Sequence, residues 1–209
     1  MKILSLIALL IFSNAVFAQQ MAVTDTGETV FLFKDGTWTY ESESDVNMVI
    51  ETNETPFEKN EDATFKVRST VNNTSIYINP KDWKFTKSSN NPDAEYEFVY
   101  QHGDLYAMSI TEEIQIELEQ LADLALLNLR AFAPNAKVVN QEFRTVNGER
   151  VLHMEFQGTG NGINFSYVGY YYSNEMGSTQ LVVYTSTSLV PKYRSAIEGL
   201  LNGLTANKA

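Results

Sequence analysis

Residues 136–157 have the sequence AKVVNQEFRTVNGERVLHMEFQ, and this stretch decides the fold class of the chain. At its centre, Asn147-Gly148 is the dipeptide that most strongly favours a two-residue β-hairpin turn. After the turn, Leu152, Met154 and Phe156 alternate with polar residues, so one face of this segment is suited to a core. The stretch therefore predicts two antiparallel strands, Ala136–Val146 and Glu149–Gln157.

The segments that follow continue this pattern. Two further strands, Ile163–Ser173 and Ser178–Thr187, are separated by the turn residues Asn174–Gly177 and extend the hairpin into a four-stranded meander. A helix is then predicted from Pro191 through Leu204, because proline is favoured in a first helical turn and apolar residues follow at helical spacing.

The segment before residue 136 predicts more strands and a long helix. Thr111 can cap a helix whose first turn carries Glu112 and Glu113, and this helix ends near Phe132, before Pro134. The strand candidates are Thr64–Thr70, Ser75–Asn79, Glu95–Gln101 and Leu105–Ile110. This order of elements is typical of an α+β fold in which helices flank an antiparallel sheet.

The N-terminal region divides into three predicted segments. Residues 1–18 have the layout of a secretory signal peptide, with Lys2, a short apolar run and cleavage after Ala18. Residues 19–40 predict a small β-hairpin that turns at Asp35-Gly36. Residues 41–62 hold eight acids and one base, which favours a solvated acidic linker. The main α+β domain is then expected to span residues 63–209.

Composition and charge exclude several classes of function. The chain has 209 residues, 15 Lys and Arg, 26 Asp and Glu, and a net charge of −11, which argues against a nucleic-acid partner. It contains no cysteine, so thiolate metal sites, disulfides and cysteine nucleophiles are excluded. After the signal peptide, no run of apolar residues is long enough for a membrane helix. We expect a periplasmic or secreted protein with no integral membrane segment.

The segment SIYINPKDWKF (residues 75–85) resembles the opening signature of PsbP-like proteins, in which a strand is followed by proline, two residues and tryptophan. The resemblance continues through the order of elements over residues 64–204. It implies an α/β/α sandwich of the PsbP/Mog superfamily, whose members act by binding other proteins and share no set of catalytic residues. Pro80 and Trp83 themselves are expected to be structural, because proline ends a strand and the indole caps a core.

The two histidines, His102 and His153, limit acid–base and metal chemistry. His153 and Glu155 share one strand face and could together hold a metal or move a proton, but an exposed sheet face has this composition without any function. We therefore assign no metal, no cofactor and no catalytic residue, and we do not expect an enzyme. The glycine-rich run 158–162 leads into a strand, so it predicts a hairpin loop and not a phosphate loop.

Two sets of residues are candidates for binding. Tyr170 and Tyr172 share a strand face near Asn161, and these three residues could bind a ligand, although cross-strand packing explains the tyrosines equally well. On the long helix, a core stripe is expected at Leu118, Leu121, Ala122, Ala125, Leu129 and Phe132. The opposite face carries the second set, a candidate docking stripe for a protein partner: Ile116, Gln120, Asp123 and Leu127.

The sequence as a whole favours an exported, non-enzymatic binding or accessory module of the bacterial cell envelope, whose protein partner is unknown. The alternative is a carrier that holds a small apolar ligand in a pocket between helix and sheet. An apolar cavity of about 300 Å³ or more would favour the carrier.

Overall fold

The computed structural model describes residues 20–23, 29–32, 38–40, 50–89 and 91–207. It divides the chain into two compact units, Met1–Glu41 and Ser42–Ala209, each of which is described by itself. The signal peptide predicted at residues 1–18 lies outside the described residues.

The N-terminal unit contains a three-stranded antiparallel sheet. Its strands are β1 (Gln20–Val23), β2 (Thr29–Leu32) and β3 (Trp38–Tyr40), with β2 in the centre. The pairing of β2 with β3 is the predicted hairpin, whereas β1 was not predicted.

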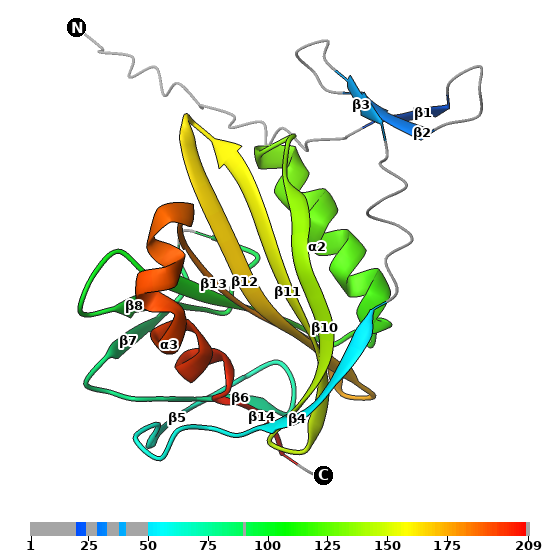
Figure 1. Cartoon of the computed structure of the whole chain (residues 1–209). Helices are drawn as coiled ribbons and strands as arrows, with labels where there is room; N and C mark the ends of the chain where they lie inside the picture. Colours follow the sequence, from blue (N-terminus) through cyan, green and yellow to red (C-terminus); the bar gives the residue numbers. More distant parts are fainter. Residues whose placement is uncertain (1–19, 24–28, 33–37, 41–49, 90, 208–209) are drawn as a thin grey trace, which may run out of the picture. The chain divides into compact units, whose positions relative to one another are not determined.

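The larger unit is built on an eight-stranded sheet with the order β4-β10-β11-β12-β13-β9-β8-β7 (Figure 1). The predicted meander is confirmed as β10 to β13, and all neighbouring pairs except β4 with β10 are antiparallel. The strands are β4 (Glu51–Phe57), β7 (Trp83–Lys87), β8 (Tyr96–Tyr100), β9 (Tyr106–Glu112), β10 (Lys137–Val146), β11 (Glu149–Gly160), β12 (Ile163–Asn174) and β13 (Gly177–Ser186).

Strand β4 corrects the prediction of a linker at residues 41–62 and of a domain start at residue 63. Residues 51–57 pair in parallel with β10 and form one edge of the main sheet. The Phe57 ring packs against the core, and the Arg144 guanidinium lies 4.5 Å from the ring centroid. An edge strand needs a partner on one side only, so most of its side chains can remain polar and exposed. Residues 41–49 lie outside the described part of the chain.

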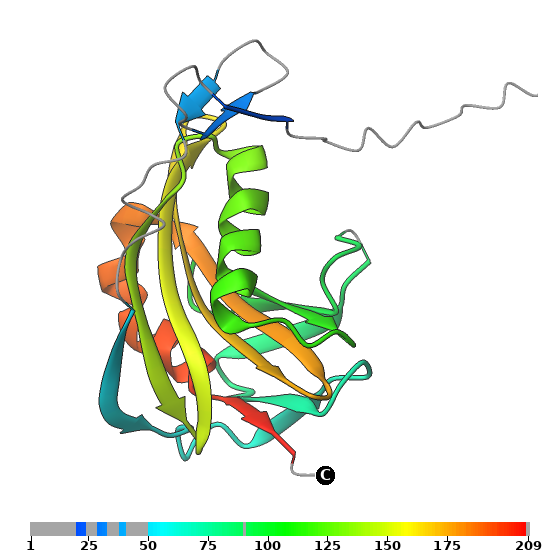
Figure 2. The same ribbon diagram turned by 90° about the vertical axis from the view of Figure 1, so that its right-hand side faces the viewer.

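The two faces of the main sheet are covered differently. Helix α2 (Leu118–Phe132) packs on one face. The other face carries the 3₁₀ turn η1 (Thr187–Leu189), helix α3 (Val190–Leu201) and a small sheet of β14 (Leu204–Ala206), β6 (Thr74–Ile78) and β5 (Phe65–Arg68). Figure 2 shows the two helices on opposite sides of the sheet. The expected α/β/α sandwich is therefore correct only in part, because a second sheet shares the α3 face.

Each face of the sheet has its own hydrophobic core. The α2-side core contains Leu152, Met154 and Phe156, as the alternation in β11 predicted. The α3-side core contains Trp83, Tyr170 and Leu201, together with apolar residues of the small sheet. Strand β12 contributes to both, with Tyr171 in the α2-side core and Tyr170 and Tyr172 in the α3-side core.

The long helix begins later than predicted. Thr111 and Glu112 belong to β9, where they pair with Thr179 and Ser178, so Thr111 does not cap the helix. The backbone hydrogen bonds between β9 and β13 extend β9 through these residues, although their side chains favour the start of a helix. In the expected core stripe, Leu118, Leu121 and Ala122 are buried and Ala125 and Leu129 are partly buried. Phe132 is instead 54% exposed, and Leu126 is buried although it was not predicted.

Two glycines at the end of α3 provide a test of this packing. A Cβ at Gly203 would lie 2.0 Å from the Tyr77 carbonyl oxygen, which is backbone and cannot rotate away. We expect Gly203→Ala to lower the free energy of unfolding by about 1–3 kcal/mol. Gly199 is the control, because a Cβ there would lie 3.7 Å from the Asn60 side-chain nitrogen, which is an ordinary contact, so Gly199→Ala should stabilise the helix by about 0.5–1 kcal/mol. Urea unfolding would measure both changes, and equal effects would contradict the packing at Gly203.

Candidate functional site

The turn between β6 and β7 is fixed by Asn79. Its side-chain oxygen accepts a hydrogen bond from the Lys81 N–H at 3.0 Å, and its side-chain amide donates to the Asp82 carboxylate at 2.7 Å. Its carbonyl accepts from the backbone N–H groups of Asp82 and Trp83. Pro80 follows directly and has a fixed φ that suits such a turn. The segment that carries the PsbP-like signature thus forms a rigid turn that directs Trp83 into the core.

This turn, residues 60–63 and α3 line a pocket of about 230 Å³, which we call the turn cleft. The residues that matter for its chemistry are Asp62, Asp82, Trp83, Tyr100, Lys192 and Tyr193. The ring centroids of Trp83 and Tyr100 are 5.2 Å apart, and those of Tyr100 and Tyr193 are 5.8 Å apart. Three contacting aromatic rings therefore line a cleft that also contains two carboxylates and one ammonium group.

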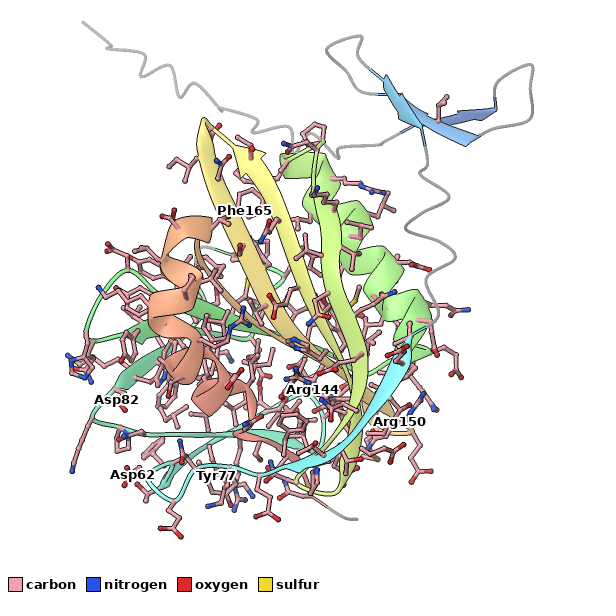
Figure 3. All side chains as sticks on the ribbon, viewed as in Figure 1. Asp62, Tyr77, Asp82, Arg144, Arg150 and Phe165 are labelled. Carbon is pink, nitrogen blue, oxygen red and sulfur yellow. The ribbon has the colours of Figure 1, made fainter. Side chains whose placement is uncertain are left out.

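The charged groups of the turn cleft are unevenly partnered. The Asp82 carboxylate lies 3.0 Å from His102 Nε2, at the exposed rim. Lys192 Nζ donates to the Tyr193 hydroxyl at 3.1 Å and lies 4.7 Å from the centroid of the same ring. Burial and the nearby Asp82 carboxylate raise the pKa of Tyr100. Neither the Asp62 carboxylate nor the Lys192 ammonium has an ion-pair partner among the described residues. Asp62 is labelled in Figure 3 with Asp82.

A second group of charged residues lies on the α3 face of β10 and β11. Arg144 pairs with Glu142 at 2.5 Å, and Arg194 of α3 pairs with Glu155 through contacts of 2.5 and 3.2 Å. His153 lies between these pairs and is only 2% exposed, so the expectation that it lies on an exposed sheet face is wrong. The Tyr170 ring and the flanking ion pairs cover it.

The ion pairs determine how this group titrates. Burial alone would raise the pKa of Glu155, but the contacts with His153 and Arg194 outweigh it and lower that pKa to about 2. Burial lowers the pKa of His153, and neighbouring Glu155 only partly offsets this effect. Neither ring nitrogen of His153 has a well-formed hydrogen bond among the described residues, since its contact with Glu155 is 3.4 Å long. Burial and the lack of hydrogen-bond partners thus both favour the neutral form of the His153 ring. The described residues contain no group of three or more His, Asp or Glu side chains arranged to hold a metal ion.

The three candidate ligand-binding residues are not brought together. Tyr170 is fully buried, and its hydroxyl donates to Asn202 at 2.8 Å. Tyr172 is also buried as a core residue, although it borders a second, open pocket of about 510 Å³. Burial and Glu149 raise the pKa of Tyr172 to about 12. Asn161 occupies the β11–β12 turn with a φ of 49°. The tyrosines pack across strands and do not form an exposed stacking platform.

The candidate docking stripe on the long helix is also divided. Ile116 precedes α2, its N–H donates to the Ser173 hydroxyl at 3.1 Å, and its side chain packs partly against the α2-side core. Gln120 and Asp123 are exposed, and Leu127 is partly exposed. These four residues therefore do not form one continuous helical face.

The sequence did not single out Lys192 or Tyr193 as site residues, because they follow Pro191 as ordinary first-turn residues. Asp62 was assigned to the acidic linker, where a solvated spacer was preferred over calcium binding. The cleft exists because the fold places the Asn79–Trp83 turn beside the first turn of α3. No spacing in the sequence indicates that these two segments meet.

The comparisons with known proteins show the fold. The sequence matches no protein-family model and no curated protein. The structure is similar to that of cyanobacterial PsbP (CyanoP) from Synechocystis sp. PCC 6803, with a TM-score of 0.55 and 12% identity over 68% of this chain and 92% of that chain. It is also similar to LpqN of Mycobacterium tuberculosis, a protein involved in cell envelope biogenesis, with a TM-score of 0.50 and 15% identity over 69% of this chain and 90% of that chain. The chain has the PsbP-like fold.

The state of His153 predicts how stability depends on pH. Because its pKa is lower in the folded chain than in the unfolded chain, the unfolded state binds more protons as the pH falls below about 6.5. The free energy of unfolding should therefore be highest above this pH and should fall as the pH is lowered through the folded-state pKa. Urea unfolding at pH 8.0 and 5.5 would measure the loss.

The control for this prediction is His153→Leu, which removes the titrating group. The variant should show a smaller stability difference between pH 8.0 and 5.5 than the parent chain. The Glu155 carboxylate titrates at a much lower pH and does not contribute in this interval. An unchanged difference would show that other groups cause the pH dependence.

Proposed function

We propose that this chain is a non-enzymatic binding or accessory module of the bacterial cell envelope, and that it holds a protein partner at the turn cleft. The observation that carries the proposal is the cleft itself, in which the Asn79–Trp83 turn meets the first turns of α3. LpqN, which shares the fold, is involved in cell envelope biogenesis, and the predicted signal peptide agrees with export.

The electrostatics support binding over catalysis. The charged side chains with the strongest contacts are closed in ion pairs, Glu142 with Arg144 and Glu155 with Arg194. A catalytic base needs access to its substrate, whereas His153 is buried behind these pairs. The Asp82–His102 pair is accessible, but none of the residues that line the turn cleft supplies a nucleophile hydrogen-bonded to it.

The pockets do not favour the alternative of an apolar-ligand carrier. The turn cleft has a volume of about 230 Å³ and carries charged side chains. The larger pocket of about 510 Å³ is open and is bordered mainly by Asn and Glu side chains. Between α2 and the sheet, large residues such as Leu121 and Phe156 are buried and fill the space where such a ligand would lie.

The described helices include none that is long and apolar enough to span a bilayer.

Photo-crosslinking tests where a partner binds. A benzophenone amino acid replaces the exposed Lys81, beside the turn cleft, or the exposed Gln120 on α2 as the control position. After irradiation in intact cells, we expect one defined crosslinked protein from position 81 and none from position 120. Mass spectrometry would identify it. A crosslink from position 120 alone would move the binding surface to α2, and no crosslink from position 81 would overturn the proposal.

A further inference from the structure

We infer that the turn cleft binds a protonated amine, and that the ligand is a lysine side chain of the partner protein. This inference rests on the proposed function and specifies the chemistry of its site. It follows from the aromatic walls of the cleft, its unpaired carboxylate and the position of Lys192.

The walls of the cleft have the composition that attracts an organic cation. The Tyr100 ring contacts both of the others, with its centroid 5.2 Å from that of Trp83 and 5.8 Å from that of Tyr193. The face of an aromatic ring carries partial negative charge and attracts an ammonium group within about 6 Å of its centroid. Such a wall also packs against the methylene groups of a lysine side chain.

The cleft also contains two carboxylates, which supply the negative charge that attracts a cation. Asp82 is held in place by Asn79 and His102, which fix the orientation of its oxygen atoms. Asp62 also lines the cleft but forms no ion pair within the described residues. An ammonium group has three N–H donors and no acceptor, so a carboxylate without a partner is the group that it needs here.

The chain already places one of its own amines on this wall. Lys192 Nζ lies 4.7 Å from the centroid of the Tyr193 ring and donates to the hydroxyl of the same residue. This contact shows that the wall accepts an ammonium group at cation–π distance. No carboxylate of the described residues lies within ion-pair distance of Lys192, so the acidic part of the cleft remains available for a second amine.

Size and charge favour a side chain over a larger ligand. A volume of about 230 Å³ is below the range of about 300–1,000 Å³ that is typical of sites for drug-sized molecules. The chain has a net charge of −11, which would steer a basic partner surface toward it.

The probe for this test is Nα-acetyl-lysine-N-methylamide, titrated into the full mature chain and followed by NMR shifts. We expect saturable shifts around Trp83, and Asp62→Asn should weaken binding by about threefold to fivefold, the size of one exposed charge contact. Asp93→Asn, which removes another exposed carboxylate outside the cleft, is the matched control and should leave the affinity unchanged.

Lys192→Met should change the affinity in the opposite direction. Removing the resident ammonium abolishes its repulsion of the probe, so binding should tighten by about twofold to threefold. Lys84→Met, at an exposed position on β7, should have no effect. The Nε-acetylated probe carries no charge and should not bind. Equal binding of the acetylated probe would show that the cleft does not recognise the ammonium charge. Weaker binding by Lys192→Met would show that Lys192 supports binding instead of repelling the probe. Either result would overturn the inference.

The crosslink from position 81 separates the two proposals. If it forms in the parent chain and also in the Asp62→Asn variant at equal yield, the partner binds at the cleft through other chemistry, and only the amine inference fails. If it is absent from the parent chain, the proposed function fails, whatever the probe titration shows.

Discussion

The packing of β11 and β12 on both of their faces is the constraint on which the rest of the domain depends. Successive side chains of β12 enter different cores, with Tyr171 under α2 and Tyr170 and Tyr172 under α3. A shift of register by one residue would exchange these sets and expose or bury the wrong side chains along the whole strand. The position of both helices therefore follows from the register of β12 on β11, which the two-residue turn Asn161-Gly162, with φ values of 49° and 78°, sets.

The same constraint explains why charged groups occur in two different states. Where α3 does not fully cover β10 and β11, the sheet carries Glu142, Arg144 and Glu155 instead of apolar residues. These groups have to be neutralised by each other and by Arg194, because a half-buried charge without a partner is costly. At the turn cleft, in contrast, Asp62 and Lys192 are close to solvent and do not need partners in the folded chain. Groups that folding has not paired are the ones that remain available for a ligand.

The sequence predicted the elements that neighbouring residues determine, such as turns. It missed the features that depend on contacts between residues far apart in the chain. The Asn147-Gly148 turn was confirmed, with φ values of 52° and 87° at its two residues. Strand β4 was missed because its acids indicate a linker, and its partner β10 lies about 90 residues later. The face of His153 was predicted correctly, but alternation does not show what covers a face, and its burial depends on Tyr170 and the ion pairs. The turn at Pro80 was assigned a structural role because proline ends a strand and the Trp83 indole caps a core. No spacing in the sequence indicates that Lys192 and Tyr193 lie beside this turn.

Strand β14 has a consequence for the time at which the chain can fold. Leu204 pairs with Ile76, so the small sheet joins residues that are separated by most of the domain. Closing so long a loop is slow compared with forming the meander hairpins. Until β14 pairs with β6, Leu204 is missing from the α3-side core and this core remains incomplete. During that interval one edge of β6 is unpaired, and an unpaired strand edge can pair with another chain and cause aggregation.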